Sequence, residues 1–161
     1  MVTDWLVRRT LGRTGLAVTP ICVGGGPLGS MPDQFGYDVG AERGTQTALA
    51  ALAGPFNFLD TSGGYSDGES ERRIGAALAR IGGIPDGFVL ATKVDRDFTT
   101  GDFSAAQVRR SLEGSLLRLG LDRVPLLYLH DPEHISFAEA TAPGGPVEEL
   151  VRIRDEGLAD H

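Results

Sequence analysis

Short apolar runs alternate with helix-like stretches along this 161-residue chain, and this alternation restricts its fold more than any other feature. Each run is too short for a helix and is bounded by Gly, Pro or Asp, as buried strands are. The runs cover residues 21–23, 56–59, 88–92 and 124–129. Four strand-then-helix units in succession predict parallel strands joined by right-handed crossover helices.

The stretches between and after the runs have the residue spacing of helices. We expect helices over residues 45–53, 70–81, 104–120 and 146–157. Ser70 is expected to cap the second helix, with Glu71 in its first turn, where the helix dipole favours a carboxylate. Ser104 and Gln107 predict a capping box for the third helix, and Gly120 can end that helix in the left-handed conformation.

Two architectures fit four such units: an open doubly wound sheet and a (β/α)8 barrel, whose chemistry lies at the carboxyl ends of its strands. Polar residues directly follow or end three of the runs, namely Asp60, Lys93 and His130. Lys93 is the only lysine among fifteen basic residues, which favours a position that needs a compact ammonium group. The repeated placement favours a barrel site, although strand ends are often polar for no functional reason.

The composition, with 41% hydrophobic and 23% charged residues, is typical of soluble globular proteins. The formal net charge of -7 argues against nucleic acid and anionic membrane surfaces as partners, because both attract basic proteins. No apolar stretch has the length of a membrane span, and the first ten residues lack the features of a secretory signal, so we expect a cytoplasmic protein. The single cysteine, Cys22, cannot form an internal disulfide and is expected to be a small buried residue.

Four segments match one protein family in their order and near its spacing. They are RRTLGRTGLAVTPICVGGGPLG, NFLDTSGGYSDGESERRIGAAL, FVLATKV and LLYLHDPE. In this order they resemble the amino-terminal hairpin with the first strand, the second strand with the tyrosine loop, and strands three and four of the aldo-keto reductase family, in its bacterial aldose or sugar dehydrogenase-like branch. The resemblance implies a parallel (β/α) barrel of the TIM type that follows a short β-hairpin. Residues 1–161 would form one partial domain with about four βα units, half of the barrel.

The resemblance also implies a catalytic set of Asp60, Tyr65, Lys93 and His130. Hydride delivery from a nicotinamide (NADP or NAD) to a carbonyl carbon leaves an alkoxide, so an acid must supply a proton to the oxygen. Tyr65 is expected to be that acid, with Lys93 as the cation that favours the phenolate and Asp60 as the partner of Lys93. His130 would donate a hydrogen bond to the carbonyl oxygen. The implied substrate is a sugar or another small aldehyde or ketone.

The residues Gly24, Gly25 and Gly26 begin a literal G-x-G-x-x-G, the fingerprint of a Rossmann turn. We reject that interpretation because the third glycine should open a helix, whereas residues 30–40 are typical of a loop. In the family that the sequence resembles, this position lies beside the nicotinamide end of the cofactor. The three glycines, with Asp60, are therefore candidate cofactor-binding residues, since small residues let the backbone approach a ligand.

Other chemistries have less support. A metal site at residues 130–134 is disfavoured because Pro132 interrupts any helix between the histidines. Tyr65 and Lys93 are not one helical turn apart, as the short-chain dehydrogenases require, and no G-x-S-x-G elbow is present. The alternative to an enzyme is a non-catalytic half-barrel that keeps these residues and serves as an interaction or scaffold protein.

A half-barrel leaves sheet edges and an apolar face uncovered. Phe58, Val89 and Leu127 are expected to point into the barrel, where one half offers them few partners. We therefore expect self-association or a complementing carboxy-terminal half.

Overall fold

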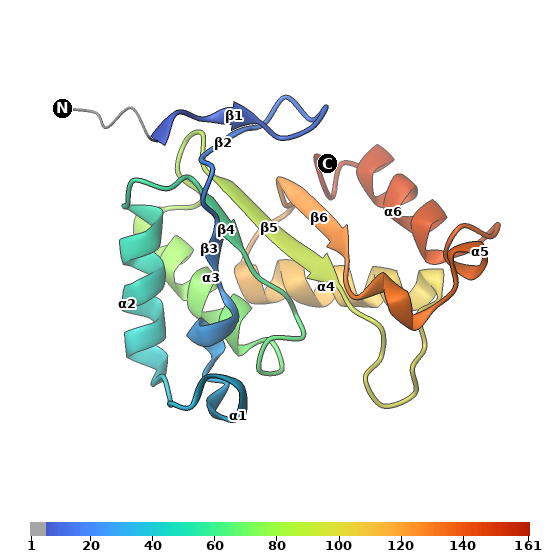
Figure 1. The fold of residues 1–161 in the computed structure, drawn as a ribbon, viewed down its shortest axis with the longest axis horizontal. Helices are drawn as coiled ribbons and strands as arrows, with labels where there is room; N and C mark the ends of the chain where they lie inside the picture. The colour runs from blue at the N-terminus through green and yellow to red at the C-terminus, as the bar shows by residue number, and fades with distance from the viewer. Residues whose placement is uncertain (1–5) are drawn as a thin grey trace.

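The computed structural model describes residues 6–161, so the first half of the segment examined for a secretory signal lies outside the described residues. Two short antiparallel strands, β1 (Arg9–Thr10) and β2 (Ala17–Val18), form a hairpin. The main sheet is parallel and contains β3 (Val23–Gly24), β4 (Phe58–Asp60), β5 (Val89–Val94) and β6 (Leu126–Leu129). These strands lie side by side in chain order (Figure 1).

A long helix follows each strand of the main sheet. These helices are α2 (Ala41–Leu52), α3 (Glu69–Ile81), α4 (Ala105–Leu119) and α6 (Pro146–Asp155). Shorter helical segments are η2 (Gly26–Gly29), α1 (Pro32–Phe35), η3 (Pro132–His134) and α5 (Phe137–Ala140). The loop expected over residues 30–40 thus contains one helical turn, α1, and the first long helix begins at Ala41, four residues before the expected start at residue 45.

The position of the helices decides between the two architectures. The larger core cluster joins one face of the sheet to all four long helices, for example Leu59 and Leu90 to Ile74, Leu112 and Ile153. A doubly wound sheet would carry helices on both faces and would reverse its strand order. The structure therefore confirms a TIM-type (β/α) arrangement of four units, preceded by the hairpin.

The hairpin lies at the amino-terminal ends of the strands and packs on the other face of the sheet (Figure 1). Val18 of β2 packs there with Val89, Ala91 and Leu126 of the sheet, and Phe58 packs against the same cluster. The expectation for Leu127 is wrong. Leu127 pairs with Thr92 in the β5–β6 register and belongs to the core under the helices, so it points away from the barrel interior.

Two expected helix caps also differ from the structure. Helix α3 begins at Glu69 after Gly68, while the Ser70 hydroxyl lies within the first turn and donates to the carbonyl of Gly25, 2.7 Å away. At α4, the Ser104 hydroxyl accepts from the backbone N–H of Gln107, but the Gln107 side chain donates to the carbonyl of Asp95 instead of closing the box. In both cases tertiary contacts take a side chain that the local pattern assigns to a cap.

The last residues extend the sheet beyond β6. Ala159 forms a parallel bridge with Val124, and the backbone N–H of Leu127 donates to the carbonyl of His161 at 2.9 Å. Residues 158–161 therefore occupy the position where a fifth parallel strand would start. Within residues 6–161, no helix combines the length and the apolar character that a membrane crossing requires.

Candidate functional site

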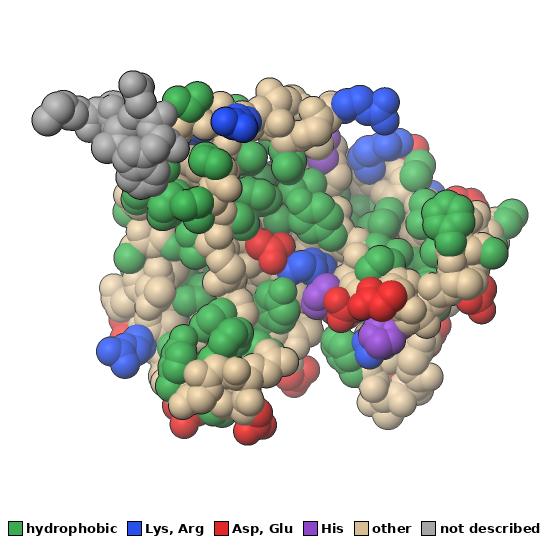
Figure 2. All heavy atoms as spheres, viewed as in Figure 1, with side chains coloured by type: hydrophobic (Ala, Val, Ile, Leu, Met, Phe, Trp, Pro, Cys, Tyr) green, Lys and Arg blue, Asp and Glu red, His purple; other side chains and the backbone are tan. Residues whose placement is uncertain are grey.

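Polar side chains meet at the carboxyl ends of the parallel strands. Asp60 is the last residue of β4, Lys93 is the next-to-last residue of β5, and His130 directly follows β6. Strand register places Asp60 beside Ala91, and Lys93 beside Tyr128, on the face that the hairpin packs against. Figure 2 shows acidic, basic and histidine side chains side by side across the middle of this face.

The Lys93 ammonium lies at the centre of this group. Its Nζ donates to Asp60 Oδ2 at 2.7 Å, to the carbonyl of Thr61 at 2.8 Å and to Tyr65 Oη at 3.0 Å. An ammonium has three protons, so these bonds commit all of them. Burial lowers the pKa of Lys93, but the hydrogen bonds to Asp60 and Tyr65 outweigh burial and raise the pKa overall. Lys93 is therefore a fixed positive charge beside the phenol oxygen.

Tyr65 comes from the loop between β4 and α3. The loop turns back on itself through Ser66 and Asp67, both in the left-handed region with φ of 53° and 50°. The backbone N–H of Tyr65 donates to the carbonyl of Ser62 at 3.2 Å, and the Ser66 hydroxyl donates to the carbonyl of Ser30 at 2.8 Å. These bonds fix the loop so that the half-buried phenol reaches Lys93 at the carboxyl end of β5.

The His130 ring approaches Tyr65 edge-on, with ring centroids 5.8 Å apart and an interplanar angle of 84°. Its Nδ1 lies 2.5 Å from Asp95 Oδ1 and 3.2 Å from the Ser62 hydroxyl. The structure thus brings together all four residues of the expected catalytic set. It adds Asp95 and Ser62, which the sequence did not single out. Each lies two positions after a site residue, but its hydrogen-bond partner comes from another part of the chain and is brought near only by the fold.

The three glycines after β3 lie in different environments. Gly24 is exposed at the end of β3, and a Cβ built on it would meet no other described atom within 4 Å. A Cβ on Gly25 would lie 2.8 Å from the carbonyl oxygen of Asp60, so close packing already explains that glycine. A Cβ on Gly26 would make ordinary contacts with Phe35. Of the three, Gly24 leaves open space next to Asp60, its partner in the strand register.

The expectation for Cys22 is wrong, because this residue is exposed. It lies directly before β3. Desolvation of the thiol and the nearby charge of Asp60 raise the pKa of Cys22 to about 11, which disfavours a reactive thiolate. In the part of the chain that the structure describes, no group of three or more His, Cys, Asp or Glu side chains could hold a metal ion.

Known proteins that are similar to this chain include sugar dehydrogenases and aldo-keto reductases. The chain is 36% identical over 149 residues to L-galactose dehydrogenase from Arabidopsis thaliana, an alignment that covers 92% of this chain and 45% of that protein. It is 35% identical over 133 residues to D-threo-aldose 1-dehydrogenase from a Pseudomonas species, covering 68% of this chain and 39% of that protein. An aldo-keto reductase structure from Bacillus halodurans matches with a TM-score of 0.72 and 25% identity, over 97% of this chain and 49% of that one.

The fold and this structural match define a protein of the TIM-type (β/α) barrel class. A sequence model of the Aldo/keto reductase family matches residues 20–161, and the chain belongs to this family. It spans less than half the length of the two curated relatives described above.

Proposed function

We propose that this chain carries the catalytic half of an NAD(P)-dependent oxidoreductase of the cytoplasm, which transfers a hydride between a nicotinamide and a carbonyl or alcohol group. The observation that carries the proposal is the hydrogen-bonded series Asp60–Lys93–Tyr65 at the carboxyl ends of β4 and β5. A phenol in contact with a fixed ammonium is suited to give and take a proton. The similarity to sugar dehydrogenases supports a sugar or another small aldehyde or ketone as substrate.

In this proposal Tyr65 Oη donates the proton to the carbonyl oxygen during reduction. The Lys93 ammonium already donates to Oη at 3.0 Å, so it stabilises the negative charge that the proton leaves there. Asp60 keeps the ammonium in place through the 2.7 Å bond. In the oxidation direction the same phenolate accepts the proton from the alcohol.

His130 orients the substrate in this proposal. Its ring lies edge-on to Tyr65, and Nδ1 faces Asp95, which leaves Nε2 as the atom available to a substrate oxygen. A carbonyl oxygen that accepts one hydrogen bond from Tyr65 Oη and another from Nε2 of a doubly protonated His130 ring is fixed by two groups at once, which favours one orientation of the carbonyl.

The residues fit a nicotinamide cofactor, NADP or NAD, which aldo-keto reductases generally use. When bound, it would supply or accept the hydride. The open space at Gly24 lets a flat ring approach the backbone beside Asp60, and we propose these two residues as its contacts. Gly25 and Gly26 belong to the same turn, and any contribution from them would come from the backbone.

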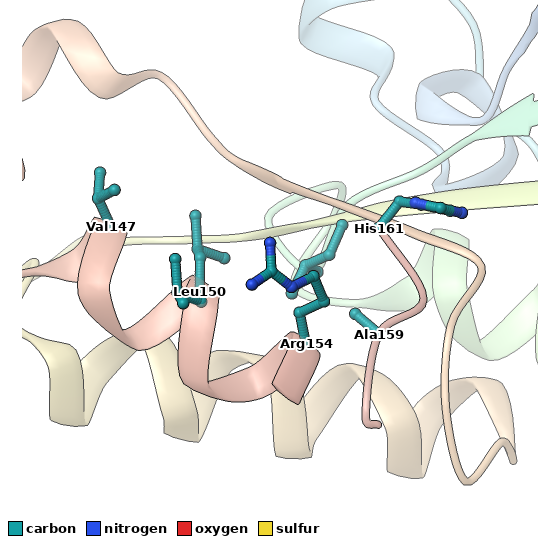
Figure 3. A pocket seen from close by; sticks show the side chains of 7 residues that line it. Val147, Leu150, Arg154, Ala159 and His161 are labelled. Carbon is teal, nitrogen blue, oxygen red and sulfur yellow. The ribbon is translucent and has the colours of Figure 1, made fainter. Parts of the chain in front are cut away.

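We further propose that the site works when the remaining half of a barrel completes it. Apolar side chains of α6 and the chain end line an open groove, in which Val147 and Leu150 point to the same side (Figure 3). The groove lies next to the edge of the sheet. At this edge, residues 158–161 have begun to pair in parallel with the sheet. A second set of strands and helices, as in the longer relatives, would cover both.

The test is co-expression of this chain with the carboxy-terminal half of a full-length relative, followed by assay of carbonyl reduction with NADPH and NADH. Tyr65→Phe removes the proton source and little volume, so it should abolish reduction while cofactor binding, measured by fluorescence, changes little. Normal reduction by Tyr65→Phe would contradict the assignment of the acid. An assembled and cofactor-binding complex without any activity would favour the scaffold hypothesis.

A further inference from the structure

We propose that Asp95 is a positioning residue of this site, which holds His130 with its proton on Nδ1 and anchors the Tyr65 loop in the same contact. The inference rests on the proposed function for its role in catalysis, but its geometry stands on the chain alone. Asp95 lies directly after β5, two residues beyond Lys93.

Three donors converge on the Asp95 carboxylate. The Ser62 hydroxyl and the backbone N–H of Gly64 both reach Oδ2 at 2.9 Å, and His130 Nδ1 lies 2.5 Å from Oδ1. The side chain is only 7% exposed, so little solvent competes with these bonds. Because an ionised carboxylate only accepts hydrogen bonds, this arrangement requires a proton on Nδ1 of His130.

The backbone of Asp95 is itself fixed by α4. Its N–H donates to the Ser111 hydroxyl at 2.8 Å, and its carbonyl accepts from the Gln107 side chain at 3.1 Å. Both partners lie within a fifteen-residue helix. The carboxylate therefore has a rigid support, as a residue that orients another side chain needs.

One carboxylate oxygen serves the Tyr65 loop and the other serves His130. Gly64 directly precedes Tyr65, and Ser62 also accepts the Tyr65 backbone N–H through its carbonyl. Asp95 thus sets the position of both groups that would meet the substrate oxygen. Because the two carboxylate oxygens bind different partners, Asp95 holds the loop after β4 and His130 after β6 in fixed positions relative to β5.

The contact also restricts what His130 can do. With Nδ1–H committed to Asp95, the neutral ring presents Nε2 as an acceptor, and Nε2 donates to a carbonyl only when the ring carries a second proton. Three charged or titratable groups contact the ring: Asp95, Tyr65 and Asp131. Asp131 Oδ1 lies 3.6 Å from Nε2, but its side chain is 50% exposed, so it constrains the ring far less.

The test reads the tautomer of His130 by long-range 1H–15N NMR on the 161-residue chain, as the pH is raised until the ring is neutral. The chain has three histidines, and His130→Gln identifies the His130 signals. In the unmodified chain we expect the neutral ring to carry its proton on Nδ1. A neutral ring with its proton on Nε2 would overturn the proposal without any variant.

Asp95→Asn provides the sharper comparison. Ser62 and Gly64 both donate to one oxygen, so the amide oxygen should take that side and the NH2 group should face Nδ1. The proton of the neutral ring should then move to Nε2, while the signals of His134 stay unchanged. Asp131→Asn, the matched control, should keep the proton on Nδ1.

Retention of the Nδ1 proton in Asp95→Asn, or its loss in Asp131→Asn, would contradict the proposal. These spectra need no turnover. A failure of the reductase assay would therefore not affect them, and a failure of the tautomer prediction would leave the Tyr65 assignment standing.

Discussion

At the scale of residues, the three hydrogen bonds of the Lys93 ammonium restrict which side chain could replace lysine at this position. Its three bonds go to a carboxylate, a carbonyl and a phenol in different directions, which suits a tetrahedral ammonium and not a planar guanidinium. In the completed enzyme, Lys93→Met and Lys93→Arg should both lower kcat/KM roughly 100-fold or more, within the usual contribution of acid–base groups. Full activity in Lys93→Arg would show that only the charge matters.

The stability of the chain should fall at alkaline pH. The folded state raises the pKa of Cys22 from 9.0 to about 11, through desolvation and Asp60, and also raises the pKa of Tyr128 and of Lys93. At alkaline pH the folded chain therefore binds more protons than the unfolded chain. The contribution of each group to the free energy of unfolding is fully present below its pKa in the unfolded chain, and it is lost as the pH rises through its higher pKa in the folded chain.

Urea midpoints measured at increasing pH should thus decline from about pH 9, the ordinary value for the thiol. Cys22→Ala removes the first of the three groups, so its decline should begin about one unit higher. Midpoints that stay level to pH 11 in both proteins would contradict this account.

The sequence could predict Asp60, Lys93 and His130 because each directly follows an apolar run, and Tyr65 through the resemblance of its loop to one family. It could not predict the role of Asp95. That role depends on the Ser62 loop and the end of β6, and these meet Asp95 only when strands from separate units align. The exposure of Cys22 was missed for a related reason, since an apolar run shows that a strand exists but not which of its faces is covered.

At the scale of elements, the contact between α3 and α4 depends on Gly75. A Cβ there would lie 2.3 Å from the carbonyl oxygen of Arg118 and 3.0 Å from Leu119 Cα, and backbone cannot move aside as a side chain can. Gly75→Ala should lower the free energy of unfolding by about 1–3 kcal/mol, as overpacking does, despite the better helix propensity of alanine.

Gly114→Ala in α4 is the matched control for Gly75→Ala. The three atoms nearest to its Cβ would belong to the Arg118 guanidinium, the closest at 3.0 Å, and the end of a side chain can give way by a few tenths of an ångström without breaking its bond to Glu71. We expect little change or a small gain from helix propensity. Equal losses in the two variants, measured by urea unfolding, would mean that the close helix contact is not the cause.

The order and type of the elements could be predicted from their periodicity, whereas their starts could not. Helix α4 ends at Leu119, and Gly120 is left-handed as expected, because a C-cap glycine acts locally. The start of α3 was misplaced because Ser70 is fully buried and bonds to the turn after β3, a partner 45 residues away in the chain.

At the scale of the whole molecule, the open groove along α6 should make the isolated chain associate at low micromolar concentration. Val147→Asp places a charge in this groove but in the first turn of α6, where a carboxylate suits the helix dipole. It should weaken association in sedimentation experiments. Phe137→Asp, at a more exposed position on α5 outside the groove, should not.

Addition of the complementing half should replace self-association with a 1:1 complex. If the unmodified chain is a compact monomer, this would contradict the proposal that the groove along α6 binds a second chain or the complementing half.

The most direct measurement follows the hydride itself in the complemented protein. With NADPH or NADH that carries deuterium at the transferred position, and an aldose or small aldehyde as substrate, mass spectrometry should find one deuterium on the carbinol carbon of the product. The Tyr65→Phe complex should bind the same cofactor and transfer none. Assembled, cofactor-bound protein that transfers no deuterium to any carbonyl compound would contradict the account, and so would transfer that does not depend on Tyr65.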